Sequence, residues 1–398
     1  MQTGCCLNAC SALPTPGRMS RITSRSRPSS APLTGSKACA TDALEGGEFE
    51  IRAAVTVNAC GPWSGELLRR APVDLSRAHR LSSTKGMNLV TRKLFDDHAV
   101  GVVSRRLSDA VVGRSRRLYF ITPWYDCSVI GTAHLAHRSD PDRCEFTQAE
   151  VEAFLEEVNG ACPGARLSLD DVRYCYGGLT PAEGEHGGEV KRAHRGVVID
   201  HQRTDRMAGL VTVVGVKYTT ARRVAEDAVD LVFRKLGRTP PPCTAKRVPM
   251  PGAQGFDPLV AEQQTVPAKN RPLDGDGMEL LKRYGTAAAR VLALGETTGP
   301  EKSWREIFRC CCRYSVREEM AVTLKDLIYL RTTLAARGRL PEDCVSWCAD
   351  TMQAELGWSM RRKQRELAAA QASALARLCG MGQKPRCSGS LEVTKQVG

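Results

Sequence analysis

Gly209-Leu-Val-Thr-Val-Val-Gly-Val216, followed by Lys217-Tyr-Thr-Thr-Ala-Arg222, is the stretch from which the fold can be worked out. Its first part is almost continuously apolar, which is typical of a buried strand in a parallel sheet. Its second part leads into a helix that Gly237 stops and whose predicted inner face is Val224, Ala228, Leu231 and Val232. Gly215 lets the backbone approach a ligand, and a helix start with Thr219 and Thr220 favours negative charge. The alternative is a plain N-cap threonine beside a solvated lysine.

A second junction of the same kind lies nearer the N-terminus. Phe49–Val57 is apolar and rich in β-formers, ends at Asn58 and runs into Gly61-Pro62-Trp63. A helix is predicted over Ser64–Arg70. Because ligands of α/β sheets bind at the carboxyl ends of strands, we expect Gly61 to approach a bound dinucleotide, with an ordinary βα turn as the alternative. We also expect the two junctions to share one sheet.

The segment between the junctions has a different pattern. From Leu81 to Leu135, short β-like runs alternate with turn residues and predict an antiparallel sheet inserted into the α/β unit, the runs being Met87–Thr91, Leu118–Ile121 and Ser128–Ile130. Thr147-Gln-Ala-Glu150 is a capping box. It predicts a following amphipathic helix whose apolar positions are Val151, Phe154, Leu155 and Val158.

The C-terminal part is predicted to be helical after a linker that begins with Pro240 and stays rich in glycine and proline to Gly277. One helix is expected over Met278–Leu294. A second capping box, Ser315-Val-Arg-Glu318, is expected to open a helix that ends near Gly338 and is lined by Met320, Leu324, Leu327 and Leu334. Further helices are expected at Cys344–Leu356 and Met360–Leu378.

Composition bounds the kind of protein. The 398 residues, of which 42% are hydrophobic and 25% charged, exclude wholesale disorder. A net charge of +13 favours anionic partners, but the basic residues are spread along the chain without a nucleic-acid motif or stacking platform, so no nucleic acid is expected. Residues 1–41 lack Asp and Glu and are rich in Arg, Ser and Pro, which predicts an unstructured leader, with a transit peptide as the alternative.

The 17 cysteines are scattered and form no pair of CxxC motifs at zinc-site spacing, so reduced structural thiols in a cytosolic compartment are expected and no metal site is. The run Cys310-Cys311-Cys312 has no functional interpretation beyond a partly buried helix face. No apolar run approaches the ~20 residues that cross a bilayer.

Several motifs together resemble one family. Asn58-Ala-Cys-Gly-Pro-Trp63 resembles an Asn-Ala-Ala-Gly-Pro-Trp element, Lys85-Gly-Met-Asn88 a Lys-Gly-Ser-His strand, and Gly215-Val-Lys-Tyr-Thr-Thr-Ala-Arg222 a Gly-Gly-Lys-x-Thr-Thr-Tyr-Arg element. Pro123-Trp124 with Ile130-Gly-Thr132, and the helices around Arg283-Tyr-Gly285, Glu319–Asp326 and Glu355–Trp358, extend the resemblance from about residue 42 to 370. These are elements of the FAD-dependent glycerol-3-phosphate dehydrogenases, in the D-amino-acid-oxidase-like flavoprotein superfamily.

The resemblance implies an α/β plus α fold: an incomplete, Rossmann-like FAD-binding domain with an inserted antiparallel-sheet substrate lobe and a C-terminal helical domain. The expected division, given in full, is a leader at 1–41, FAD-binding parts at 42–80 and 176–238, the lobe at 81–175, a linker at 239–277, the helical domain at 278–380 and a loose tail at 381–398.

The activity that the resemblance implies is oxidation of sn-glycerol 3-phosphate to dihydroxyacetone phosphate, with hydride passing to FAD and electrons to a quinone or another acceptor. By analogy Lys217 lies against flavin and substrate, and Arg195 holds the phosphate, with His194 and His201 as nearby alternatives. The implied cofactor-binding residues are Asn58, Gly61, Pro62, Trp63, Gly215, Thr219 and Thr220. A cytoplasmic protein, peripheral on an anionic inner membrane, and a homodimer are the corresponding expectations.

Three departures from the family pattern bear on this activity. No Gly-x-Gly-x-x-Gly follows a strand anywhere in the chain, although the family carries this ADP-binding fingerprint. Asn88 stands in place of a frequent His and cannot accept a proton at neutral pH, and Thr180 replaces an Arg that would grip a phosphate. The alternatives are therefore a non-catalytic or truncated relative that binds without tightly held FAD, or a related flavin-dependent oxidoreductase with another substrate.

Overall fold

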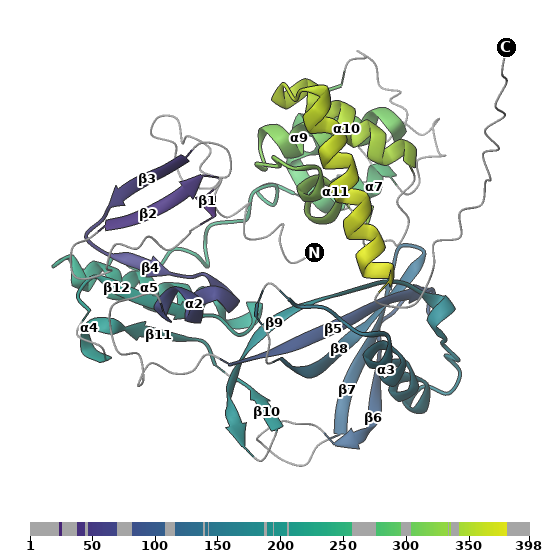
Figure 1. The fold of residues 1–398 in the computed structure, drawn as a ribbon, viewed down its shortest axis with the longest axis horizontal. Coiled ribbons are helices and arrows are strands. Elements are labelled where there is room, and N and C mark those ends of the chain that lie inside the picture. The colour runs from purple at the N-terminus through teal and green to yellow at the C-terminus, as the bar shows by residue number, and fades with distance from the viewer. Residues whose placement is uncertain are drawn as a thin grey trace, which may run out of the picture.

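The computed structural model describes residues 24–25, 38–43, 47–69, 82–107, 116–137, 140–141, 143–186, 189–193, 195–204, 207–256, 276–295, 304–332, 334–335 and 342–379. These residues form three sheets and a group of C-terminal helices (Figure 1). The fold is mixed α/β with an antiparallel lobe and a helical domain, as the sequence predicts.

The sheet that carries both predicted junctions has the strand order β11-β12-β4, with bounds Val197–Asp200, Leu210–Val214 and Thr56–Asn58. β12 and β4 are parallel, with Thr212 opposite Asn58. β4 continues into the short helices η1 (Gly61–Trp63) and α2 (Ser64–Arg69), and β12 into η4 (Tyr218–Thr220) and α5 (Ala221–Lys235). Val224 and Ala228 of α5 are buried, whereas Leu231 and Val232 are partly exposed.

The prediction of a single strand over Phe49–Val57 is wrong. The segment is divided into β3 (Gly47–Arg52) and β4, and β3 belongs to a separate antiparallel sheet with β2 (Ala38–Ala43) and β1 (Ser24–Arg25). The prediction of an unstructured leader is wrong at β1 and at the start of β2, because β-pairing supplies backbone hydrogen bonds that composition does not reveal. The other residues of 1–41, and the tail 381–398, lie outside the described part of the chain.

The predicted antiparallel lobe is confirmed as a six-stranded sheet, ordered β10-β9-β5-β8-β7-β6. Its strands, in chain order, are β5 (Ser82–Arg92), β6 (Val100–Leu107), β7 (Arg116–Trp124), β8 (Cys127–His137), β9 (Val172–His186) and β10 (Glu189–Arg192). The expected boundary at residue 175 falls inside β9, which pairs with β5 from Val172 to Ala182. The lobe therefore continues to Arg192, because β9 pairs with β5 as far as Ala182 and also with β10, which ends at Arg192.

One face of the lobe is covered by α3 (Gln148–Ala161), whose predicted capping box at Thr147 and Glu150 is present. The four predicted apolar positions of α3 are buried against the sheet, where Tyr119 meets Phe154 edge to face at 5.0 Å between ring centroids. Alternation along the strands places Met87, Tyr119 and Ile130 on this covered face.

Lys85 fixes the start of α3 to the sheet. Its side chain is largely buried, and its Nζ lies 2.7 Å from Glu150 Oε1 and 2.9 Å from the carbonyl oxygen of Glu145, to which it donates. Burial raises the pKa of Glu150, but hydrogen bonds from Lys85 and Thr147 outweigh this, and the pKa lies below its ordinary value. Lys85 therefore stabilises the lobe from its covered face.

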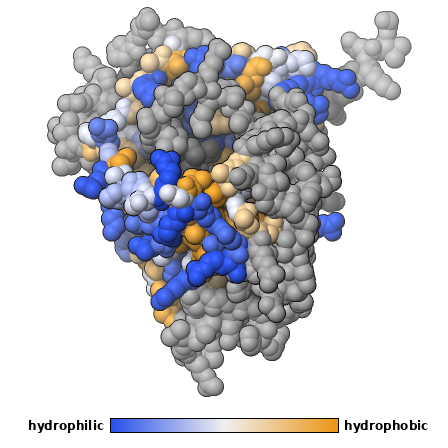
Figure 2. Space-filling view, turned by 90° about the vertical axis from the view of Figure 1, so that its left-hand side faces the viewer, coloured by the Kyte–Doolittle hydropathy of each residue, from blue (hydrophilic) through white to orange (hydrophobic). Residues whose placement is uncertain are grey.

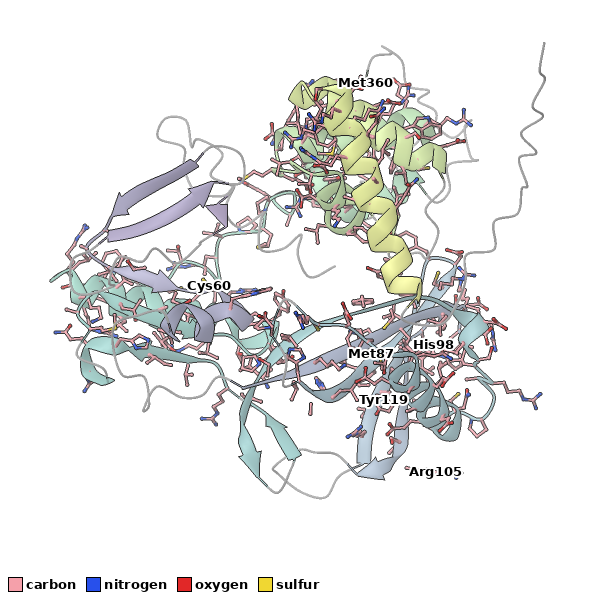
Figure 3. The ribbon with its side chains drawn as sticks, in the orientation of Figure 1. Cys60, Met87, His98, Arg105, Tyr119 and Met360 are labelled. Atoms are coloured by element: carbon pink, nitrogen blue, oxygen red, sulfur yellow. The ribbon has the colours of Figure 1, made fainter. Side chains whose placement is uncertain are left out.

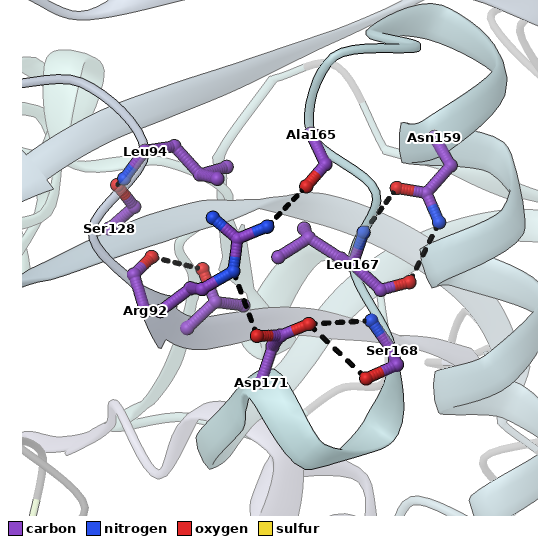
Figure 4. A network of polar contacts seen from close by, with 9 residues as sticks. Arg92, Leu94, Ser128, Asn159, Ala165, Leu167, Ser168 and Asp171 are labelled. Carbon is purple, nitrogen blue, oxygen red and sulfur yellow. Dashed lines mark hydrogen bonds and ion pairs between the residues drawn. The ribbon is translucent and has the colours of Figure 1, made fainter.

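A polar network fixes the chain that returns from α3 to β9 (Figure 4). Arg92 donates from Nε to Asp171 Oδ1 at 2.8 Å and from Nη2 to the carbonyl oxygen of Ala165 at 2.6 Å. Asn159 makes two 2.8 Å hydrogen bonds with the backbone of Leu167. This connection is consequently held by charge-assisted and amide hydrogen bonds as well as by apolar packing.

The helical domain departs from the sequence-based boundaries. Met278–Leu294 is divided into α7 (Asp276–Tyr284), η5 (Gly285–Ala287) and α8 (Ala288–Leu292), because Gly285 has φ +54°. A Cβ on Gly285 would lie 2.0 Å from the carbonyl oxygen of Gly252, which accepts a hydrogen bond from the N–H of Thr286. The middle of the predicted linker, at Gly252, is thus packed against the helices.

The second predicted capping box is also wrong. Ser315 lies in the last turn of α9 (Trp304–Arg317), where its hydroxyl donates to Glu319, so this segment ends a helix instead of opening one. The cap is eight residues on, where the N–H of Thr323 donates to Asp326 and the N–H of Asp326 donates to Thr323 Oγ1. It opens the π-helix η6 (Asp326–Arg331). α10 (Glu342–Leu356) and α11 (Met360–Cys379) agree with prediction.

The three parts meet along β9. The turn η1 of the small sheet lies against β9, and α11 of the helical domain reaches the same strand (Figure 1). No helix among the described residues is long and apolar enough to cross a membrane.

The Lys85–Glu150 ion pair yields a test of the lobe's stability. Glu150→Gln keeps the shape but leaves a largely buried ammonium without its carboxylate, so we expect the free energy of unfolding to fall by about 3 kcal/mol at neutral pH. Because the folded-state pKa of Glu150 is depressed, wild-type stability from this group is full above the unfolded pKa and is lost as pH falls through the folded pKa. The difference between wild type and variant should therefore shrink in acid.

Urea unfolding followed by circular dichroism at neutral and acidic pH measures both effects. Glu156→Gln, an exposed position on the same helix, is the matched control and should change stability little at either pH. Equal losses in the two variants would contradict the assigned role of the ion pair.

Candidate functional site

The two predicted junctions lie at one edge of the small sheet. Because β4 and β12 are parallel neighbours, η1 after β4 and η4 after β12 both leave the sheet at its carboxyl edge. The expectation that the junctions share a sheet is therefore confirmed. We call this the strand-end edge and define it by the predicted residues Asn58, Gly61, Pro62, Trp63, Gly215, Lys217, Thr219 and Thr220.

Arg195 belongs to the same edge. It stands two residues before Val197, which begins β11 and pairs with Val214, the last residue of β12. Its side chain is exposed, like that of Lys217. Two of the predicted cationic groups are thus placed at the end of the sheet from which β12 enters its turn.

A buried hydrogen-bond network holds the turn after β4. Asn58 is 1% exposed, and its Nδ2 donates to Thr212 Oγ1 and to the carbonyl oxygen of Ser64, both at 3.2 Å. Its Oδ1 accepts from the N–H of Cys60 at 3.3 Å. Asn58 therefore joins β4 to β12 and shapes the turn, in which Gly61 has φ +56°. We call Asn58, Thr212 and His201 the edge network.

His201 completes the edge network and is not at the surface. Its side chain is fully buried, and its Nε2 lies 2.8 Å from Thr212 Oγ1. His201, one of the two sequence-based alternatives to Arg195, is therefore a structural residue of the edge network. His194, the other alternative, lies outside the described residues.

The turn after β12 leaves the helix start open. Thr220 occupies the N-cap position of α5 but makes no side-chain capping bond, and its hydroxyl donates instead to the carbonyl oxygen of Lys217 at 3.3 Å. Thr220 is thus the N-cap residue of α5 by position, as the alternative interpretation has it, but its hydroxyl does not cap the helix. The first N–H groups of a long helix carry partial positive charge, which an anionic or electron-accepting group can use.

The strand-end edge has room for a ligand. A Cβ on Gly61 or Gly215 would meet no atom within 4 Å, and Trp63 and Tyr218 are 43% and 56% exposed. Two open glycine backbones, an open helix start and two aromatic side chains fit the flavin end of FAD. Among the described residues there is no glycine-rich turn suited to its pyrophosphate, so the fit concerns the flavin half of the group.

Asn88 and Thr180 lie on the lobe, on the face opposite α3. Asn88 faces Gly131 and Tyr176 on the neighbouring strands, and its Oδ1 accepts from Thr132 Oγ1 at 2.9 Å. A Cβ on Gly131 would come within 1.9 Å of that oxygen, so a larger residue at this position would displace the Asn88 amide. Asn88 is therefore held in one orientation on this face.

Thr180 pairs with Thr84, four residues from Asn88 along β5. At ~3.3 Å per residue the two side chains are about 13 Å apart along the strand, with Gly86 and Gly178 between them. The structure thus brings Asn88 and Thr180 onto one face without bringing them into contact. The turn η1 lies against β9, the strand that carries Thr180.

Sequence reasoning missed several residues of these two surfaces. Thr212 and Thr132 each hold a predicted site residue, and His134 lies opposite Gly86 on the lobe face. Strict alternation along β8 would put Thr132 and His134 on the covered face with Ile130, because the register shift beside Thr132 cannot be read from the sequence. Nothing local in the sequence pairs Thr212 with Asn58, which is 154 residues away.

The views of the side chains agree with this arrangement. Cys60, in the turn after β4, lies apart from Met87 and Tyr119 in the lobe core (Figure 3). On the side of the molecule that carries α5, hydrophobic side chains lie among hydrophilic ones (Figure 2).

Two protein families match the chain. Residues 31–224 match the family described as FAD dependent oxidoreductase, and residues 243–363 match the C-terminal domain of alpha-glycerophosphate oxidase. The first match begins inside the predicted leader, which agrees with the strand found at Ala38–Ala43.

Curated relatives are glycerol-3-phosphate dehydrogenases. One from Synechocystis sp. is 29% identical over 342 residues, covering 82% of this chain and 60% of the relative. The aerobic glycerol-3-phosphate dehydrogenase of Bacillus subtilis is 27% identical over 338 residues, covering 81% of this chain and 57% of the relative. The chain thus spans at most 60% of the length of these relatives.

A solved structure shares the fold. The glycerol-3-phosphate dehydrogenase from Bacillus halodurans complexed with FAD is similar with a TM-score of 0.69 and 23% identity, over 87% of this chain and 67% of that chain. Its likeness supports the arrangement of FAD-type domain, lobe and helical domain.

The edge network can be tested through Thr212→Val. Valine keeps the shape but removes the oxygen shared by Asn58 and His201 in a dry interior, so the free energy of unfolding should fall by about 1–3 kcal/mol. Thr220→Val, which removes a hydroxyl at the partly exposed helix start, is the control and should cost less than about 0.5 kcal/mol. Urea unfolding measures both, and similar costs would mean that the network does not hold the sheet together.

Proposed function

Because this chain belongs to the FAD-dependent glycerol-3-phosphate dehydrogenase family, we propose that it binds FAD at the strand-end edge and oxidises sn-glycerol 3-phosphate to dihydroxyacetone phosphate. The observation that carries the proposal is the parallel pairing of β4 with β12, which puts both turns at one open edge beside the lobe. When bound, FAD supplies the acceptor for the hydride from C2.

The strand-end edge would hold the flavin end of FAD. The turn shaped by Asn58, with Gly61, Pro62 and Trp63, lies on one side, and Gly215 with the start of α5 lies on the other. Lys217 and the helix start, at Thr219 and Thr220, would stabilise the negative charge that reduction creates. These roles need access to the backbone, which the exposure of both turns provides. They also need positive potential, which Lys217 and the start of α5 would provide.

The lobe face would bind the substrate through neutral polar groups. Asn88, oriented by Thr132, can hydrogen-bond a substrate hydroxyl but cannot take up its proton. Thr180 offers a hydroxyl and no guanidinium, so the phosphate would be held by Arg195 at the strand-end edge. A related substrate without a phosphate is the corresponding alternative.

The onward path of the electrons is part of the proposal. By family analogy a membrane quinone is the acceptor, with another acceptor as the alternative. The net charge of +13 favours a peripheral contact with anionic lipid on the cytoplasmic side. A homodimer is the proposed assembly.

A second candidate is a binding module without tightly held FAD. It is favoured by the sequence, in which no Gly-x-Gly-x-x-Gly follows a strand, so the backbone cradle for the pyrophosphate is not evident. The two candidates differ in retention of the cofactor, which can be measured directly.

The visible absorption spectrum of the purified chain, before and after FAD is added and removed by desalting, separates the candidates. The enzyme candidate is supported if flavin absorption is retained after desalting and if adding glycerol 3-phosphate in the absence of oxygen then bleaches it. In that case Lys217→Ala should lower turnover at least tenfold, and Lys246→Ala, an exposed lysine after α5, should leave it unchanged. Unaltered turnover in folded Lys217→Ala would reject its role, and a colourless folded protein would favour the binding module.

The substrate proposal has its own test. Thr180→Arg restores a bidentate phosphate donor on the lobe face, so the KM for glycerol 3-phosphate, or its Kd measured by calorimetry, should fall about tenfold. Glycerol, which has no phosphate, is the control ligand and should bind no better. An unchanged affinity for glycerol 3-phosphate would place the phosphate away from residue 180.

A further inference from the structure

The cysteine run that the sequence left without a function lies in the helical domain. Cys310, Cys311 and Cys312 occupy α9 and are buried, and Cys344 and Cys348 are buried one turn apart on α10. All five of these cysteines are free thiols. The two helices pack directly against each other, so thiols from both meet in one apolar core.

One pair in this cluster is already in contact. The Sγ atoms of Cys312 and Cys348 are 3.9 Å apart, and both side chains are fully buried. A disulfide has a sulfur–sulfur length of about 2.05 Å, so a small movement of the two helices would suffice for bonding. Cys344 is the nearest competitor on α10, whereas Cys311 packs in a different cluster with Tyr284.

The surroundings keep this pair reduced while the domain is closed. Its neighbours in the core include Leu324, Ile328 and Met352, all fully buried. Burial, followed by the contact with Cys348, raises the pKa of the Cys312 thiol well above its usual range. Since the thiolate is the nucleophile, reaction requires local opening that admits water and reagent.

We propose that Cys312 and Cys348 are a latent disulfide site, which a low-molecular-weight disulfide oxidises when α9 and α10 open locally and which then joins these helices covalently. The proposal is independent of the flavin chemistry, because none of these residues belongs to the strand-end edge or the lobe face.

The reaction balances as two exchanges. One cysteine loses its proton to water and attacks a sulfur of the reagent disulfide, forming a mixed disulfide and expelling one reagent thiolate. The second cysteine loses its proton and attacks the protein sulfur of the mixed disulfide, expelling the other thiolate. Two cysteines are oxidised, the reagent disulfide is reduced to two thiols, and the two protons end on those thiols.

Oxidised glutathione is the probe, applied to the full chain at increasing urea concentrations below the unfolding transition. We expect peptide mapping to find Cys312 joined to Cys348, in a linked peptide pair two hydrogen atoms lighter than the two reduced peptides, and we expect the rate of its formation to rise with urea. The oxidised protein should also unfold at a higher urea concentration, because the cross-link restricts the unfolded chain.

Substitutions assign the partners. Cys312→Ser and Cys348→Ser should each abolish the cross-link, with Cys312→Ala and Cys348→Ala in their place if serine is not tolerated in the core. Cys311→Ser, at the position just before Cys312 on the same helix, is the matched control and should retain the cross-link. Three results would overturn the proposal. One is a cross-link from Cys312 to Cys344, and another is a glutathione adduct on Cys312 or Cys348 that never goes on to form the protein disulfide. The third is an unchanged cross-link in the Cys312 variants.

Discussion

The parallel contact between β4 and β12 is the constraint on which the site depends. Three residues of β4 are too few to hold a strand in a sheet by backbone pairing alone, and the edge network adds side-chain hydrogen bonds at the same place. Asn58 uses its amide in both directions, toward Thr212 across the strands and toward the turn that follows. Since these groups are buried, each lost hydrogen bond would leave a polar group in a dry interior. The two turns can therefore form a common edge only while this network is intact.

Much of the fold follows from local pattern. The predicted runs in β5, β7 and β8, the capping box of α3 and the helices α10 and α11 follow from period, cap and burial, whereas β6, β9 and β10 were not predicted as strands of the lobe. The failures have local causes too. Ser315-Val-Arg-Glu318 has the letters of a capping box, yet it closes α9, because Thr323 and Asp326 make the cap further on. Gly285 interrupts the predicted helix because the backbone of Gly252 approaches it closely. The periodicity of apolar residues in the helix does not reveal this approach.

The candidate site was predictable to the extent that each of its two turns has a motif of its own in the sequence. Glycine, a hydroxyl pair and a lysine at the end of an apolar run identify the turn after β12, and Asn-x-x-Gly-Pro identifies the turn after β4. Their positions in one sheet could be expected, whereas the partners that orient them could not. Thr212, His201 and Thr132 act across strands that are distant in sequence, and the register of those strands is decided by the whole sheet. The substitution of Thr180 for arginine is visible in sequence, but its consequence depends on Arg195 at another edge.

β9 links the parts of the molecule mechanically. This strand runs from Val172 to His186, pairs with β5 along the lobe, lies against the turn η1 and is reached by α11. A strand with hydrogen bonds on both edges resists stretching far better than a loop would, so it can transmit a displacement from one end to the other. The C-terminal helices and the strand-end edge do not share a sheet, but both contact the same strand, β9. A change in how α11 packs on β9 therefore acts on the same strand against which the turn η1 lies, although no residue of the helical domain is among those that define the strand-end edge.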